Sequence, residues 1–267
     1  MRFIIILALV ASAVAEPAGG PEKGSLFIHG GGRLTRQHIT EFIKLAGGPD
    51  GPFVIIPGAL EGENWGAAYV SRSFLVHAGA KNVSVLHTRD RAVADSAEFV
   101  APLTKARGVW IDGGRQWRLA DSYLGTRTVA ELHAVLARGG VIGGSSAGAT
   151  IQGSYLVRGA PEGNHIMMAK GHEEGFAFLK NVAIDQHTIA RKRENDLAPV
   201  IDAHPKLLGF GIDEATALIV QGNRARNAGE SKVVVHDKAY VPGSDGLRYF
   251  LLSPGETLDL VTRRIAK

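Results

Sequence analysis

Residues 139–150 read Gly-Gly-Val-Ile-Gly-Gly-Ser-Ser-Ala-Gly-Ala-Thr, and this stretch predicts a buried strand that turns sharply into a helix. Val141 and Ile142 indicate the end of a short buried strand, and residues 144–148 match the G-x-S-x-G pattern of a nucleophile elbow. In such an elbow a strand turns sharply into a helix, and the central serine takes a strained conformation that exposes its hydroxyl. Ser146 is therefore the candidate nucleophile. An ordinary strand-to-helix turn with a serine N-cap would show the same pattern.

Short apolar runs and helical patterns alternate before this stretch. The other runs that indicate strands are residues 25–29, 53–56, 83–86 and 109–111. The helical patterns cover residues 39–46, 63–78, 93–106 and 128–138. Apolar strands that alternate with helices predict an α/β fold with a mostly parallel sheet, covered on both faces.

The C-terminal part does not continue this alternation of strands and helices. Strands are expected at 155–157 and 182–184, and a charged helix interrupted by Pro199 at 191–204. Late runs at 233–235 and 249–252 predict antiparallel additions to the sheet. There is no internal repeat and no clear linker, so we expect a single domain over residues 25–267.

Ligands bind beyond the carboxyl ends of the strands in sheets of this kind. Glycines and polar residues gather at those ends, at residues 29–32, 57–58, 112–114 and 143–146. We therefore expect the functional site at this edge of the sheet.

The first fifteen residues are organised like a secretory signal peptide. Arg2 precedes the apolar run 3–10, and small residues end in an A-x-A pattern at 13–15. We expect cleavage after Ala15, a mobile Pro/Gly-rich leader at 16–24, and export to the periplasm or the medium. The run is too short to cross a bilayer as a helix, so no membrane partner is expected. The chain has no cysteine, so its stability must come from packing.

Composition argues against several classes of protein. The formal net charge is only +4, and no basic run is interleaved with aromatic residues, so nucleic-acid binding is not expected. The sequence has no H-E-x-x-H motif, no Cys/His cluster and no nucleotide-binding glycine pattern. Neither a metal nor a cofactor is therefore expected. The sequence leaves a homodimer open.

A serine hydroxyl needs a base within hydrogen-bond reach, and this base is usually a histidine oriented by a carboxylate. Among ten histidines, His187 is favoured because it ends an apolar strand and follows the polar pair Asp185 and Gln186. His29, at a strand end beside three glycines, is either functional or structural. His38, within a helical pattern, is expected at the surface or partly packed.

The favoured carboxylate is Glu214, which precedes the apolar run 217–220. Asp213 better suits a turn residue that binds local N–H groups. Glu162 is a weaker candidate because it lies in a Pro/Gly loop.

Backbone N–H groups suited to an oxyanion hole occur at two places. Ala147 begins the helix after Ser146, and its N–H can face a developing oxyanion. Gly113 and Gly114 present N–H groups without side chains after the strand at 109–111. A phosphate cradle is the competing interpretation of these glycines.

Four short motifs resemble those of the S51 serine peptidases, the family of cyanophycinase and aspartyl dipeptidase, from about Leu26 to about Val220. The motifs are Gly113-Gly114-Arg115-Gln116 with Arg118-Leu119, Gly144-Ser145-Ser146-Ala147-Gly148-Ala149, Asp185-Gln186-His187 with Arg191 and Arg193, and Gly209-Phe210-Gly211-Ile212-Asp213-Glu214 with Thr216-Ala217-Leu218. The resemblance implies a flavodoxin-like sheet related to class I glutamine amidotransferases. It also implies a Ser146–His187–Glu214 triad and an oxyanion hole from the N–H groups of Gly114 and Ala147.

The third motif is more similar to cyanophycinase, which cleaves an aspartate polymer with arginine on each side chain into β-Asp-Arg dipeptides. The resemblance therefore implies a serine exopeptidase whose substrate is rich in aspartate and arginine, and the export expected from residues 1–15 fits attack on an insoluble polymer outside the cell. Arginine binds carboxylate bidentately, which suits Arg191 and Arg193. Asp185 is expected to receive the substrate guanidinium. The other expected substrate-binding residues are Gln116, Arg118 and Gln186.

Three departures leave an aspartyl or isoaspartyl dipeptidase open as the alternative. Arg115, Thr188 and Asp196 stand where the family usually has Asn or Asp, an aromatic residue and a further arginine.

Two rivals lie outside the family. An α/β-hydrolase esterase would use residues 29–32 as its His-Gly-Gly-Gly oxyanion motif, but its acid would precede its histidine in the chain. A secreted binding protein with an inactive site is the other rival.

Overall fold

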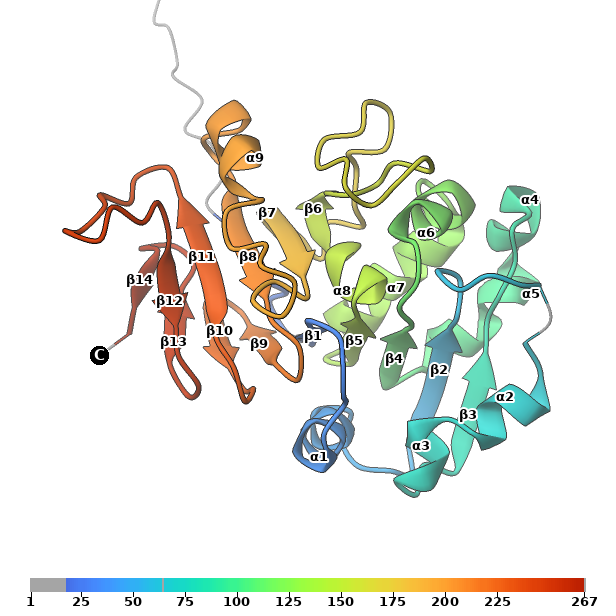
Figure 1. The fold of residues 1–267 in the computed structure, drawn as a ribbon. Helices are drawn as coiled ribbons and strands as arrows, with labels where there is room; N and C mark the ends of the chain where they lie inside the picture. The colour runs from blue at the N-terminus through green and yellow to red at the C-terminus, as the bar shows by residue number, and fades with distance from the viewer. Residues whose placement is uncertain (1–17, 64, 267) are drawn as a thin grey trace, which may run out of the picture.

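The computed structural model describes residues 18–63 and 65–266, arranged as two sheets with helices packed around them (Figure 1). The predicted signal peptide and its cleavage site lie outside the described residues. Ala18 is fully buried and Gly19 pairs with Lys180, so the described part of the expected mobile leader is packed against the body.

The larger sheet has nine strands within the described residues, in the order β14-β13-β10-β9-β1-β5-β4-β2-β3. Strands β1 to β5 run parallel, and β9, β10, β13 and β14 add to β1 in antiparallel pairing. These strands are β1 (Ser25–His29), β2 (Pro52–Ile56), β3 (Asn82–Val85), β4 (Gly108–Ile111), β5 (Val141–Ser145), β9 (Ala217–Gln221), β10 (Arg224–Asn227), β13 (Thr257–Asp259) and β14 (Arg264–Ile265). The predicted α/β architecture with C-terminal antiparallel additions is confirmed.

The other late strands form a second sheet in the order β12-β11-β8-β7-β6. Its members are β6 (Gly153–Tyr155), β7 (Leu179–Gln186), β8 (Leu208–Ile212), β11 (Val233–Asp237) and β12 (Phe250–Leu252). Strands β6 to β8 are parallel, whereas β11 and β12 are antiparallel.

Alternate residues of the central strands enter two different cores, so both faces of the larger sheet are covered. Leu26 and Ile28 of β1 join one core, and Phe27 joins the other. The first core is shared with α6 (Gln116–Tyr123), α7 (Arg127–Ala137) and the second sheet, and the other with α1 (Arg36–Leu45) and α3 (Phe74–His77).

Two expected helices are broken into shorter ones. The first becomes α2 (Ala67–Ser71) and α3, because the Ser73 side chain caps a new helix. The second becomes α4 (Arg91–Ala94), α5 (Ala97–Val100) and the 3-10 turn η1 (Ala101–Lys105), because Ser96 caps α5. The helix expected at 191–204 is only α9 (Ala198–Ala203). The remaining helix, α8 (Ala147–Thr150), follows the elbow.

Substitution of Trp110 tests the packing of the core that contains Phe27. The Trp110 ring centroid lies 4.9 Å from that of Phe74 and 5.3 Å from that of Phe42. We expect Trp110→Ala to lower the free energy of unfolding by about 3–5 kcal/mol, measured by urea denaturation. Val241→Ala is the control, since Val241 is 81% exposed and should change stability by less than about 0.5 kcal/mol. Equal midpoints for the two variants would contradict this packing.

Candidate active site

Ser146 lies at the sharp turn between β5 and α8, which is the strand–turn–helix context that the elbow requires. Its φ of 55° and ψ of −111° lie in a region that costs about 1–3 kcal/mol for a residue with a side chain. The Ser146 side chain makes no capping hydrogen bond, so it does not act as an ordinary N-cap. A Cβ at Gly144 would lie 2.2 Å from the Gly148 carbonyl oxygen, which explains the glycine at that position.

His187 bridges Ser146 and Glu214. Its Nε2 lies 3.0 Å from Ser146 Oγ, and its Nδ1 lies 2.6 Å from Glu214 Oε1. The side chains of His187 and Glu214 are 10% and 39% exposed. A carboxylate at Nδ1 keeps the proton on that nitrogen and leaves Nε2 free to accept a proton from the serine.

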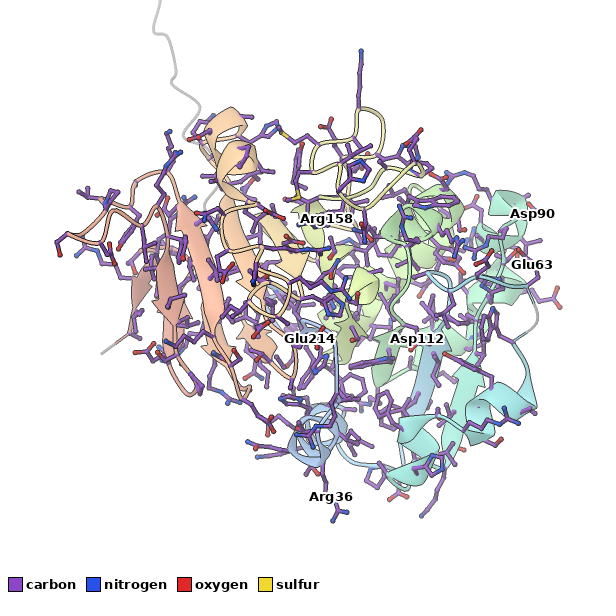
Figure 2. All side chains as sticks on the ribbon, viewed as in Figure 1. Arg36, Glu63, Asp90, Asp112, Arg158 and Glu214 are labelled. Atoms are coloured by element: carbon purple, nitrogen blue, oxygen red, sulfur yellow. The ribbon has the colours of Figure 1, made fainter. Side chains whose placement is uncertain are left out.

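Neighbouring strands bring these three residues together, although 68 positions separate the first from the last in the chain. β5 and β1 are paired so that Ser145 is opposite His29, and Ser146 N–H donates to the His29 carbonyl oxygen. β7 and β8 are paired so that Gln186 is opposite Ile212, and His187 and Glu214 follow these two strand ends. Figure 2 shows Glu214 in the central part of the molecule, where the strands of the two sheets meet.

Two expected oxyanion donors lie beside the elbow. A Cβ at Gly113 would be 3.3 Å from Ser146 Cβ, which places Gly113 against the nucleophile. Gly114 has a φ of 139°, and a side chain there would collide with the Ala59 carbonyl group. Within the described part of the chain, the N–H groups of Gly114 and Ala147 donate no hydrogen bond.

Burial lowers the pKa of the His187 imidazole below its ordinary value of 6.5. The hydrogen bond to Glu214 raises this pKa, and the nearby cations Arg191 and Arg193 lower it further. The imidazole is therefore neutral at pH 7, as a general base must be.

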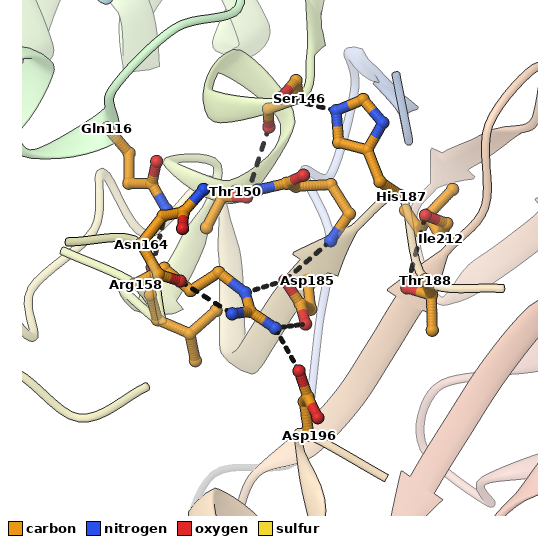
Figure 3. Close-up of polar contacts among 12 residues, drawn as sticks. Gln116, Ser146, Thr150, Arg158, Asn164, Asp185, His187, Thr188, Asp196 and Ile212 are labelled. Carbon is orange, nitrogen blue, oxygen red and sulfur yellow. Dashed lines mark hydrogen bonds and ion pairs between the residues drawn. The ribbon is translucent and has the colours of Figure 1, made fainter. Parts of the chain in front are cut away.

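Asp185, which is predicted to receive a substrate guanidinium, is paired with Arg158 within the protein. Arg158 Nε and Nη2 donate to the two carboxylate oxygens of Asp185 over 2.7 and 2.8 Å, and Asp185 is fully buried (Figure 3). Arg158 Nη2 also donates to Asp196 Oδ2 over 2.6 Å, and Nη1 to the Asn164 carbonyl oxygen over 2.7 Å. The protein's own guanidinium therefore binds both carboxylates.

Gln116 also differs from its predicted role. It is 1% exposed, and its side-chain amide donates to the Val157 carbonyl oxygen over 2.9 Å. Arg115 donates to the Ala160 carbonyl oxygen over 2.6 Å. Both side chains thus anchor the segment that carries Arg158, and the amide nitrogen of Gln116 is engaged within the protein.

The other predicted substrate-binding residues lie around His187 and α6. Arg191 and Arg193 follow His187 in a tight turn, in which their N–H groups donate to the carbonyl oxygens of His187 and Thr188. Gln186 is 5% exposed, and its side-chain oxygen has no partner within the described residues. The Arg118 guanidinium lies over the Trp117 ring, 5.3 Å from its centroid.

The residues after β1 do not form the oxyanion hole of an esterase. Gly30 N–H donates to the Thr216 carbonyl oxygen, and Gly31 N–H donates to His29 Nδ1. Both N–H groups are therefore engaged, which argues against the α/β-hydrolase interpretation. Asp213 accepts hydrogen bonds from Ala190 N–H and the Ser231 hydroxyl, which are distant in the chain, and not from the local N–H groups expected of a turn residue.

Two polar contacts near the site had no clear sequence signal. Arg158 follows an apolar run, and only its position there hinted at burial. Asp112, next to Gly113, accepts a hydrogen bond from the Tyr69 hydroxyl, and burial raises the pKa of Asp112 to about 6.

In the described ranges, no group of three or more His, Cys, Asp or Glu side chains is arranged to hold a metal ion. None of the helices described is long and apolar enough to span a membrane.

Known proteins are similar to this chain in sequence and in fold. The sequence pattern of peptidase family S51 matches residues 26–228. Cyanophycinases from Synechococcus elongatus and Thermosynechococcus vestitus are each 31% identical over 251 residues, covering 86% of this chain and 76% of theirs. A peptidase from an acI-B1 Actinobacterium has a similar crystal structure, with a TM-score of 0.68 at 24% identity, covering 90% of this chain and 98% of its own.

The Arg158 pair predicts a large loss of stability when it is broken. Arg158→Ala leaves Asp185 buried without its cation, and we expect a loss of about 3–5 kcal/mol in the free energy of unfolding. Arg33→Ala is the matched control, because Arg33 and Glu230 form an exposed pair that is worth about 1 kcal/mol or less. Urea denaturation measures both, and similar losses would contradict the buried ion pair.

Proposed function

Because this chain belongs to peptidase family S51 and is a serine-type peptidase, we propose that Ser146 is its nucleophile, His187 its base and Glu214 the carboxylate that orients the base. The observation that carries this proposal is the continuous hydrogen-bonded chain from Ser146 Oγ through the imidazole to Glu214. No other serine–histidine–carboxylate chain of this kind is formed by the described residues.

In this mechanism His187 Nε2 takes the Ser146 proton while Oγ attacks the scissile carbonyl carbon. The N–H groups of Gly114 and Ala147 donate to the oxyanion, and one such donor is worth about 3–4 kcal/mol. His187 then gives its proton to the leaving amine as the C–N bond breaks. Water, deprotonated by the same imidazole, hydrolyses the acyl-enzyme and restores Ser146.

For the substrate, we propose cyanophycin, cleaved to β-Asp-Arg dipeptides by attack at chain ends. Support comes from the cyanophycinases that this chain resembles and from Arg191 and Arg193, whose guanidinium groups suit the carboxylates of an aspartyl chain. The pairing of Asp185 with Arg158 removes one expected contact for the substrate's arginine. An aspartyl or isoaspartyl dipeptidase therefore stays as the second candidate.

Secretion is part of the proposal. The signal-like residues 1–15, with cleavage after Ala15, would deliver the enzyme to the periplasm or the medium, where an insoluble polymer can be attacked.

The test is mass spectrometry of the products that the purified protein releases from cyanophycin. We expect β-Asp-Arg from the wild type, and a rate lower by about three to six powers of ten for Ser146→Ala. Ser73→Ala, which changes a helix cap outside the site, is the matched control and should keep its rate. Free arginine alone would contradict the substrate, and full turnover by Ser146→Ala would contradict the mechanism.

The lowered pKa of His187 predicts the acid limb of the pH profile. The base works when neutral, so kcat/KM on an aspartyl peptide should rise with pH and reach half its maximum below pH 6.5. Glu214 raises this pKa, so Glu214→Gln should move the limb to lower pH and slow turnover by about 10²–10⁴-fold. Glu162→Gln is the control and should match the wild type. A limb centred above pH 6.5 would contradict the assignment.

A further inference from the structure

His29 is a buried polar residue that the proposed mechanism does not use. It ends β1, is fully buried, and its Nδ1 accepts a hydrogen bond from Gly31 N–H over 3.2 Å. The Ser145 hydroxyl lies 3.2 Å from the same nitrogen. Within the described residues, Nε2 has no hydrogen-bond partner, although the backbone of Arg33 lies close enough to the ring to raise its pKa.

The His29 ring is a neutral acceptor. Burial lowers its pKa to about 3, and the neighbouring rings of His38 and His187 lower it as well. Because Nδ1 accepts from a backbone N–H, the ring proton is on Nε2, and the Ser145 hydroxyl must act as the donor in its contact with Nδ1.

The backbone held by this nitrogen is the glycine turn, residues 30–32, on which the site is built. The Gly30 carbonyl oxygen accepts from His187 N–H over 2.9 Å, and the Gly31 carbonyl oxygen from Ala215 N–H over 3.0 Å. A Cβ at Gly31 would lie 2.2 Å from His187 Cε1, and one at Gly32 would lie 2.7 Å from Glu214 Oε2. A shift of this turn would therefore displace both the imidazole and the carboxylate.

Three consecutive glycines do not hold one conformation by themselves. Glycine loses more conformational freedom on folding than any other residue, and Gly31 and Gly32 have φ values of 111° and 67°. A hydrogen bond from Gly31 N–H to a buried side chain selects one arrangement of the turn. The His29 carbonyl oxygen accepts from Ser146 N–H over 3.0 Å, so His29 contacts the nucleophile segment as well.

We propose that His29 is a positioning residue for the reaction at Ser146: as a neutral acceptor it fixes the glycine turn against which His187 and Glu214 pack. The effect of His29 on the reaction rate rests on the proposed function, but its effect on the position of His187 and Glu214 does not. The His-Gly-Gly-Gly sequence thus supports the base and its carboxylate, and does not bind the oxyanion.

The test compares variants that keep or lose the acceptor. Asparagine places its amide oxygen where Nδ1 lies, so His29→Asn keeps the bond to Gly31, whereas glutamine reaches the Nε2 position and leucine has no acceptor. The main readout is the rate at which a fluorophosphonate modifies Ser146, which needs no knowledge of the substrate. We expect His29→Gln and His29→Leu to react about 10–100-fold more slowly and His29→Asn to stay within about threefold of wild type.

His38→Leu is the matched control for loss of a core histidine. His38 is 2% exposed and packs against His29, with ring centroids 5.1 Å apart, but its side chain bonds to Thr35 N–H and the Ala228 carbonyl oxygen and not to the glycine turn. It should lower the melting temperature yet keep the labelling rate. Equal rates for His29→Asn and His29→Gln, or an equal loss in His38→Leu, would overturn the proposal, even if His29→Leu does not fold.

A crystal structure of His29→Gln separates this proposal from the proposed function. We expect the distance from Ser146 Oγ to His187 Nε2, 3.0 Å in the wild type, to exceed about 3.5 Å. An unchanged distance would overturn the positioning role whether or not the wild type is labelled. A wild type that does not react with the probe would instead count against Ser146 as the nucleophile.

Discussion

The active site depends on the close contact between the His187 imidazole and the glycine turn after β1. Any side chain at Gly31 would occupy the space of the ring, and the Gly30 carbonyl oxygen holds the His187 backbone. His187 itself has a φ of 55°, which a residue with a side chain keeps only when its surroundings enforce it. Ser146 and Ala215, which follows Glu214, also have positive φ values. In the proposed catalytic arrangement, strained residues at the strand ends are held by hydrogen bonds to His29 and to the glycine turn that follows it.

The charges around this arrangement bear on what the site can bind. The single Arg158 guanidinium pairs with both Asp185 and Asp196, and Glu214 is engaged with His187. Arg191 and Arg193 form no ion pair within the described residues, and they lie close enough to His187 to lower its pKa. Within the described residues, Arg193 Nη1 is buried without a hydrogen-bond partner, which leaves it as a donor for a ligand carboxylate. This agrees with an aspartyl substrate of either kind, a cyanophycin chain or a shorter peptide.

Much of the fold could be predicted because its central strands carry a local signal. Strands that are apolar on both faces, such as residues 109–111, predict a parallel sheet covered on both sides. The glycines around Ser146 predict the sharp turn of the elbow. The second sheet could not be predicted, since pairing between β7 and β8 depends on distant contacts. The partners of Asp185 and Gln116 within the protein could not be predicted, because Arg158 and the Val157 carbonyl group lie 27 and 41 positions away in the chain. The broken helices reflect capping serines within otherwise apolar patterns.

A crystal structure of the protein with an aspartyl peptide aldehyde tests most directly whether Ser146 is the nucleophile and whether Gly114 and Ala147 bind the oxyanion. We predict a covalent bond from Ser146 Oγ to the aldehyde carbon, with the resulting oxygen within about 3.1 Å of the N–H groups of Gly114 and Ala147. His187 should remain between this adduct and Glu214. An aldehyde bound elsewhere would contradict Ser146 as the nucleophile, and an oxygen that points away from both N–H groups would contradict the proposed oxyanion hole.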